Sequence, residues 1–130
     1  MANPTIDELG PLQRQALELL WEAGAGTVYD LLAQLPDPKP PYTSVLSALQ
    51  KLEKIGWATA RRDGRQYVYA PAKTRDELDA LTLRAFVHRV FRGKTARVFQ
   101  HLLDDPTLSA EELAELKRLV ERRRREASDV

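Results

Sequence analysis

The chain has 130 residues, of which 43% are hydrophobic and 30% are charged. This is enough for one ordinary packed domain, or for a small domain with an oligomerisation appendage. It contains no cysteine, which excludes disulfides, thiolate nucleophiles and cysteine-based metal sites. No secretion signal is visible, and the apolar runs are far shorter than the ~20 residues that a membrane-spanning helix requires, so we expect a cytoplasmic protein without membrane association.

Three helices are predicted in the first part of the chain. Apolar residues at spacings of three and four indicate a first helix from about Glu8 to Ala23. Thr27 and Asp30 have the spacing of a capping box at the start of a second helix, which a proline-rich loop ends. A third amphipathic helix is expected over residues 43–55.

A β-hairpin should follow the third helix directly. Two strand-like runs, residues 57–62 and 66–70, are separated by Asp63-Gly64, which is a strong hairpin signal. A short helix followed at once by a hairpin is typical of a winged helix-turn-helix. We therefore predict a mainly α fold with a small β-hairpin wing, in which residues 1–72 form a winged-helix DNA-binding domain.

From Thr74 onward the pattern is entirely helical, with Ser109 and Glu112 forming a capping box for the last helix. These short helices carry more apolar surface than they can bury among themselves. They either pack on the first domain or pair with a second copy, and we favour the second because Pro71 and Lys73 have the character of a junction. Residues 73–130 are thus predicted to form a helical dimerisation region, through Leu81, Phe86, Val90, Phe91, Val98, Phe99, Leu102, Leu103, Leu113 and Leu116.

Charge is distributed unevenly, although the formal net charge is only +1. Residues 1–38 hold one basic and six acidic side chains, whereas residues 39–65 hold six basic and two acidic ones. Binding to phosphates depends on the local field of one face rather than on the total charge. The basic segment is also the segment of the third helix and the hairpin, which favours a DNA-binding regulator.

Small polar and basic side chains occupy the outer face of the third helix, and three arginines surround the hairpin turn. Small side chains allow a helix to approach base edges closely, and the cations suit the phosphate backbone. A merely solvated helix face and a charge-protected sheet edge are the alternatives. The predicted DNA-binding residues are Tyr42, Thr43, Ser44, Ser47, Lys51, Lys54, Arg61, Arg62 and Arg65.

We find no set of residues that would support catalysis or a cofactor. His88 and His101 are the only histidines, and they lack the spacing of metal ligands, so no metal or cofactor is expected. An enzyme is therefore not predicted. A winged-helix protein-interaction module without DNA binding is the main alternative. The run of arginines at residues 122–125 is interpreted as a frayed helix end rather than a second nucleic-acid contact.

Several segments resemble the penicillinase-repressor (BlaI/MecI-type) family of bacterial winged-helix regulators. They are Ala16 to Trp21, Tyr42 to Leu52, Asp63 to Pro71 and Leu108 to Leu113. This resemblance implies a homodimeric transcriptional repressor that binds double-stranded DNA at a palindromic operator. It also implies a regulatory protease or sensor as a partner.

Two features depart from the family's pattern. The copper-responsive branch uses a C-terminal cysteine cluster, which is missing here, so copper sensing of that kind is excluded. In the β-lactam branch the protease cuts an Asn-Phe bond, whereas the corresponding place here reads His101-Leu102. Induction by that cleavage is therefore not expected, and a protease of different specificity is the alternative.

Overall fold

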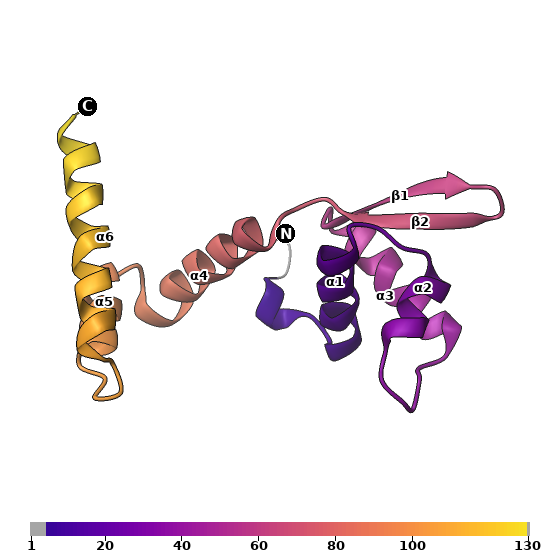
Figure 1. The fold of residues 1–130 in the computed structure, drawn as a ribbon, viewed down its shortest axis with the longest axis horizontal. Coiled ribbons are helices and arrows are strands. Elements are labelled where there is room, and N and C mark those ends of the chain that lie inside the picture. The colour runs from indigo at the N-terminus through magenta and orange to yellow at the C-terminus, as the bar shows by residue number, and fades with distance from the viewer. Residues whose placement is uncertain (1–4, 130) are drawn as a thin grey trace. The chain divides into compact units, whose positions relative to one another are not determined.

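The computed structural model describes residues 5–129, and it confirms a mainly helical fold with one two-stranded antiparallel hairpin (Figure 1). The chain folds into two compact units, the first ending at Ala85 and the second beginning at Phe86. In chain order the elements are η1 (Ile6–Glu8), α1 (Pro11–Ala23), α2 (Val28–Gln34), α3 (Tyr42–Lys54), β1 (Ala58–Asp63), β2 (Gln66–Pro71), α4 (Arg75–Phe91), α5 (Thr95–Leu103) and α6 (Ala110–Ser128).

The first helix begins later than its apolar pattern predicted. Residues 6–8 form a separate 3-10 turn, and α1 starts at Pro11 rather than at Glu8. A proline disfavours helical backbone at the residue before it, and Gly10 is accordingly extended. Proline is well suited to the first helical position, and the side-chain oxygen of Gln13 accepts a hydrogen bond from the Gly10 amide at 3.1 Å.

The capping box of α2 is confirmed, with the Asp30 amide donating to Thr27 Oγ1 at 3.2 Å and the Thr27 amide donating to Asp30 Oδ2 at 2.9 Å. The other end of α2 is closed by a side chain from the following loop. Lys39 Nζ donates to the carbonyls of Leu32 and Leu35 at 2.7 and 2.8 Å. A cation is favourable at these unpaired carbonyls, so this lysine fixes the loop that leads into α3.

The hairpin has a regular register that runs from Ala58 opposite Pro71 to Asp63 opposite Gln66. The connecting turn is therefore Gly64 and Arg65, one residue later than the predicted Asp63-Gly64, because Asp63 is still paired in β1. Gly64 has φ 65°, a conformation that favours glycine. Outside the hairpin pairing, Gly26 and Tyr69 exchange two backbone hydrogen bonds, which attach the start of α2 to β2.

One apolar core holds the first unit together. Its most deeply buried side chains come from α1, α3 and α4, and they include Leu17, Leu20, Val45, Leu49, Leu52 and Leu78. Leu78 is 0% exposed, so the first half of α4 belongs to this core. One turn further along α4, the Thr82 hydroxyl Oγ1 accepts a hydrogen bond from the Ile6 amide at 3.1 Å.

Polar contacts tie the start of α4 to α1. The Trp21 indole donates to the Lys73 carbonyl at 2.9 Å, and the Arg75 guanidinium lies 4.6 Å from the centre of the Trp21 ring. The same guanidinium makes two hydrogen bonds to the Glu18 carboxylate. These bonds hold the pKa of Glu18 below its ordinary value of 4.5.

The Glu18–Arg75 pair predicts a pH-dependent stability. Because the folded-state pKa of Glu18 lies below the unfolded value, the pair stabilises the fold above about pH 4.5 and loses this effect as the pH falls below that value. Glu18→Gln should therefore lower the melting temperature at pH 7, and the difference from wild type should shrink towards pH 3. A thermal-melt series by circular dichroism checks this, and a difference that is independent of pH would contradict it.

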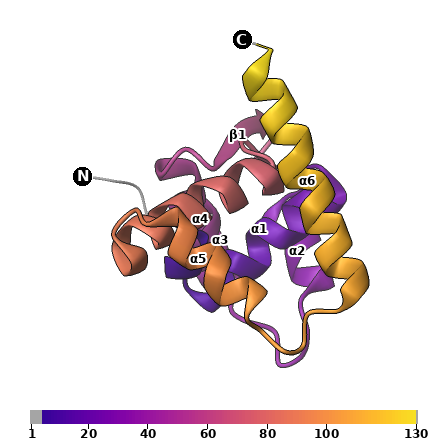
Figure 2. The same ribbon diagram turned by 90° about the vertical axis from the view of Figure 1, so that its left-hand side faces the viewer.

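The second unit contains α5, α6 and the end of α4 (Figure 2). The predicted capping box of α6 is confirmed, with the Glu112 amide donating to Ser109 Oγ at 3.1 Å and the Ser109 amide donating to Glu112 Oε1 at 3.2 Å. The ring of Phe91 lies 5.8 Å from the rings of both Phe86 and His101. Among residues 86–129 none is buried, so the apolar side chains of this unit are exposed or, like Phe91, Val98 and Leu116, only half-buried in a single chain.

Candidate nucleic-acid interface

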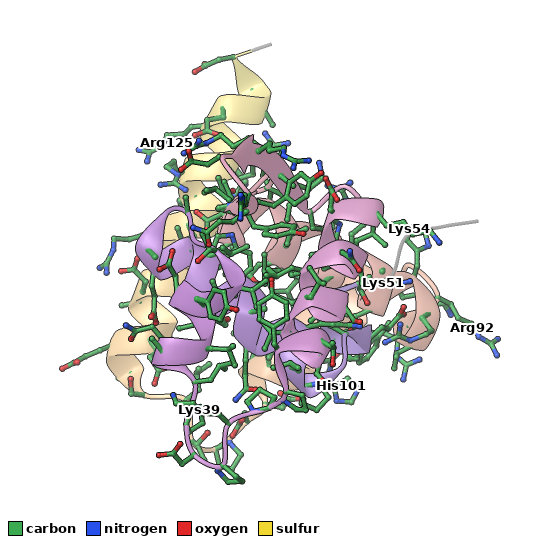
Figure 3. The ribbon with its side chains drawn as sticks, turned by 90° about the vertical axis from the view of Figure 1, so that its right-hand side faces the viewer. Lys39, Lys51, Lys54, Arg92, His101 and Arg125 are labelled. Carbon is green, nitrogen blue, oxygen red and sulfur yellow. The ribbon has the colours of Figure 1, made fainter. Side chains whose placement is uncertain are left out.

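Helix α3 presents a polar outer face because its aliphatic residues are concentrated on the opposite side. Val45, Leu49 and Leu52 are fully buried in the core. At about 100° per residue, the opposite face carries Thr43, Ser47 and Lys54, which are all exposed as predicted. In Figure 3, Lys51 and Lys54 extend from the side of α3 that lies away from α2. The predicted basic face is thus accessible to a large partner.

Other residues predicted for this face lie at its edges. Ser44 is half-buried and, with Thr43 and Ser47, lines an open depression of about 430 Å³ beside the first turn of α1. Tyr42 lies on the opposite edge, with its ring centre 5.0 Å from that of Tyr29 in α2. The two edges of α3 therefore differ in character: one adjoins α1, and the other adjoins α2 and the hairpin.

The strand register separates the arginines of the hairpin. Arg61 pairs with Val68 and Arg62 pairs with Tyr67, so the two arginines lie on opposite faces of the ribbon. Arg62 folds back on the hairpin, where its Nε donates to the Gly64 carbonyl at 3.2 Å and its guanidinium lies 5.7 Å from the Tyr67 ring. Arg65 occupies the turn itself and is exposed.

A groove of about 400 Å³ separates α3 from the hairpin, and the sequence pattern did not predict it. All four tyrosines of the protein line it, together with Gln50, Gln66, Arg65 and Glu53. Burial and the nearby Glu53 raise the pKa of Tyr69, so this hydroxyl stays neutral. The tyrosines come from α2, α3 and β2. In the sequence, only the alternation of Tyr67 and Tyr69 in one strand indicated that two of them share a face.

The described part of the chain offers little for other chemistry. Among residues 5–129, no group of three or more histidine or carboxylate side chains is placed to hold a metal ion. Nor does any helix within this range combine the length and the apolar character needed to cross a bilayer. His88 and His101 are both exposed.

Comparison with known proteins places the chain in a family of repressors. The family model described as "Penicillinase repressor" matches residues 9–122. The penicillinase repressor of Bacillus licheniformis is 21% identical over 121 residues, which cover 89% of this chain and 91% of that protein.

Solved structures of bacterial regulators also align with much of the chain. The adhesin competence repressor of Streptococcus pyogenes is 20% identical, with a TM-score of 0.43 over 92% of this chain and 81% of that chain. BpsR of Bordetella bronchiseptica is 18% identical, with a TM-score of 0.44 over 95% and 77%. The match of the family model over most of the chain shows that the protein belongs to the penicillinase repressor family and is a DNA-binding transcriptional repressor of the winged-helix class.

Proposed function

We propose that this repressor acts as a homodimer on a palindromic operator. The observation that carries this proposal is the open apolar surface of the second unit. Its exposed large apolar side chains lie on α4, α5 and α6, and they include Val90, Phe99, Leu102, Leu103, Leu113 and Val120. Residues 86–129 contain no buried residue, and a segment of this size cannot be stable without a core.

A second copy of the same chain is the partner that best fits this surface. Most bacterial repressors must place two reading helices on one duplex, and a two-fold dimer does so with a single type of interface. The exposed apolar side chains of α5 and α6 also support pairing, because the same apolar surface on two copies can cover itself around a two-fold axis. The residues predicted for dimerisation are the ones named from the sequence, from Leu81 to Leu116.

Each winged-helix unit would then bind one half of the operator. In this proposal Thr43, Ser44, Ser47 and Lys51 read base edges, whereas Lys54 and the hairpin arginines contact phosphates. Tyr42 contacts a thymine methyl group or a phosphate. The two half-sites should lie one helical turn apart, about 10 base pairs, or a multiple of this distance.

Selection from a pool of random duplexes tests the proposal without knowledge of the operator. The full-length protein should enrich an inverted repeat with half-sites at the spacing above. Enrichment of a single, asymmetric site would contradict the dimer, and the absence of any enriched duplex would contradict sequence-specific binding.

Ser47→Ala tests the reading face of α3. Ser47 is exposed in the middle of this face, so its loss should leave the fold intact. We expect the preference at one position of each half-site to weaken by about 1–3 kcal/mol, with little change in binding to unrelated DNA. Competition binding with single-base variants of the selected duplex measures this. Unchanged preferences at every position would assign base reading to other residues.

A releasing protease is a further element of the proposal. The His101-Leu102 bond lies inside α5, and a protease requires an extended segment. Cleavage there would therefore depend on local unfolding of α5.

A further inference from the structure

The groove between α3 and the hairpin is lined by an unusual concentration of neutral hydrogen-bonding side chains. Tyr29 is 66% exposed and Tyr67 is 48% exposed, so their hydroxyls are accessible from solvent. Gln50 and Gln66 add amide groups to the same lining. Of the four tyrosines, only Tyr69 is buried.

The width of the DNA major groove decides what can lie beside α3. A helix with its side chains is about 10–12 Å across, and the major groove is about 12 Å wide. A helix inserted there has a phosphate strand along each of its two flanks. The flank towards α1 carries Ser44, a predicted DNA contact. Lys51, another predicted contact, lies on the side away from α2 in Figure 3. The other flank is the tyrosine-lined groove.

We propose that this groove receives one sugar–phosphate strand of the duplex, with phosphate oxygens accepting hydrogen bonds from Tyr29, Tyr67 and Gln66. This inference rests on the proposed mode of DNA binding and adds residues that the sequence did not indicate. Tyrosine hydroxyls and glutamine amides are common donors to phosphates. They fix the position of the strand without a full positive charge.

The charged residues of the groove define where the strand lies. Arg65 stands in the turn of the hairpin and favours phosphate. Glu53 lies near the C-terminal end of α3 and repels it. The strand should therefore follow the tyrosines and the hairpin turn and keep away from Glu53. Replacing this carboxylate by the neutral amide in Glu53→Gln should tighten binding.

Neutral and charged contacts can be separated by their dependence on salt. A lost phosphate contact from arginine releases one counterion fewer and lowers the magnitude of the salt slope by about 0.9, whereas a lost neutral hydrogen bond leaves the slope unchanged. Removing two hydroxyls that each contribute a typical hydrogen bond of about 0.5–1.5 kcal/mol should weaken binding by about 5- to 150-fold. A loss of affinity at an unchanged salt slope therefore distinguishes the contacts of the groove from those of the basic residues around it.

The experiment measures binding of the full-length protein to a mixed-sequence 30-base-pair duplex by fluorescence anisotropy at several salt concentrations. We expect the double variant Tyr29→Phe/Tyr67→Phe to bind more weakly by the factor above, with the wild-type salt slope. Arg65→Ala should lower the slope by about one. Gln15→Ala, on the exposed side of α1, is the matched control and should bind like wild type. Circular dichroism confirms that each variant is folded.

Three results would overturn the inference. If wild type binds the duplex and the double phenylalanine variant binds equally well, the groove does not hold a strand, although the protein still binds DNA. A change of salt slope in the double variant would likewise contradict the neutral contacts. If wild type itself fails to bind duplex DNA, the proposed function and this inference fail together.

Discussion

Leu102→Glu should convert the dimer into monomers and lower operator affinity by orders of magnitude. Leu102 is 54% exposed in the single chain and lies outside the core of the first unit, so the substitution leaves the winged-helix unit folded. In the dimer its side chain is expected to be covered by the second copy. A buried carboxylate without a partner costs about 3–5 kcal/mol, which raises the dimer dissociation constant at least about 100-fold.

The effect on DNA binding follows from the linkage of two half-sites. When one winged helix is bound, the second is present at an effective concentration that raises the overall affinity about 10²–10⁴-fold. Monomers lose this gain and should bind a half-site and a full operator with similar affinity. Analytical ultracentrifugation and anisotropy with the selected duplex measure the two effects.

Gln100→Glu is the matched control for this substitution. It adds the same charge to the same helix, on a face away from the apolar stripe of α5, and it should leave the dimer unchanged. If Leu102→Glu remained dimeric at micromolar concentration, the surface proposed for dimerisation would be wrong. If both variants dissociated, the effect would come from charge on α5 in general rather than from a lost apolar contact.

The double variant Arg61→Ala/Arg62→Ala should weaken binding to all duplexes by a similar factor. Each arginine contact that releases one counterion contributes roughly eightfold at 0.1 M salt. Loss of one contact should therefore lower affinity about eightfold and the magnitude of the salt slope by about 0.9, and loss of both should lower them about 60-fold and by about 1.8. Base preferences should stay as in wild type because phosphates carry no sequence information.

Single variants resolve the two faces of the hairpin. Arg61 and Arg62 lie on opposite faces, so a duplex that contacts only one face will respond to only one of the substitutions. A salt slope that falls by about 1 for one variant and is unchanged for the other would assign the contact to that face. Unchanged affinity in the double variant at fixed salt would contradict a DNA-contacting role of the wing.

Local features were predictable from the sequence because they depend on residues close together in the chain. The capping boxes of α2 and α6 involve side chains three residues apart, and both are present as expected. The hairpin was located correctly, although its turn lies one residue further on, because strand pairing extends to Asp63. The inward and outward faces of α3 followed from the helical period alone.

Features that depend on tertiary contacts were not predictable in the same way. Lys39 was counted in the basic segment from the sequence. In the structure its ammonium group donates to the carbonyls of Leu32 and Leu35 at the end of α2. The contacts of Trp21 and Arg75, which attach the start of α4 to α1, join residues more than 50 positions apart. The tyrosine-lined groove likewise forms only when α2, α3 and the hairpin are assembled.

Hydroxyl-radical footprinting of the selected duplex tests most directly that two copies of α3 and the hairpin bind opposite halves of one operator. The protein should protect two segments related by a two-fold axis, with centres about 10 base pairs apart or at a multiple of this distance. Within each half, protection should extend to the backbone on both sides of the bound major groove. A single continuous footprint without symmetry, or no protection at concentrations where the protein is folded, would contradict the account.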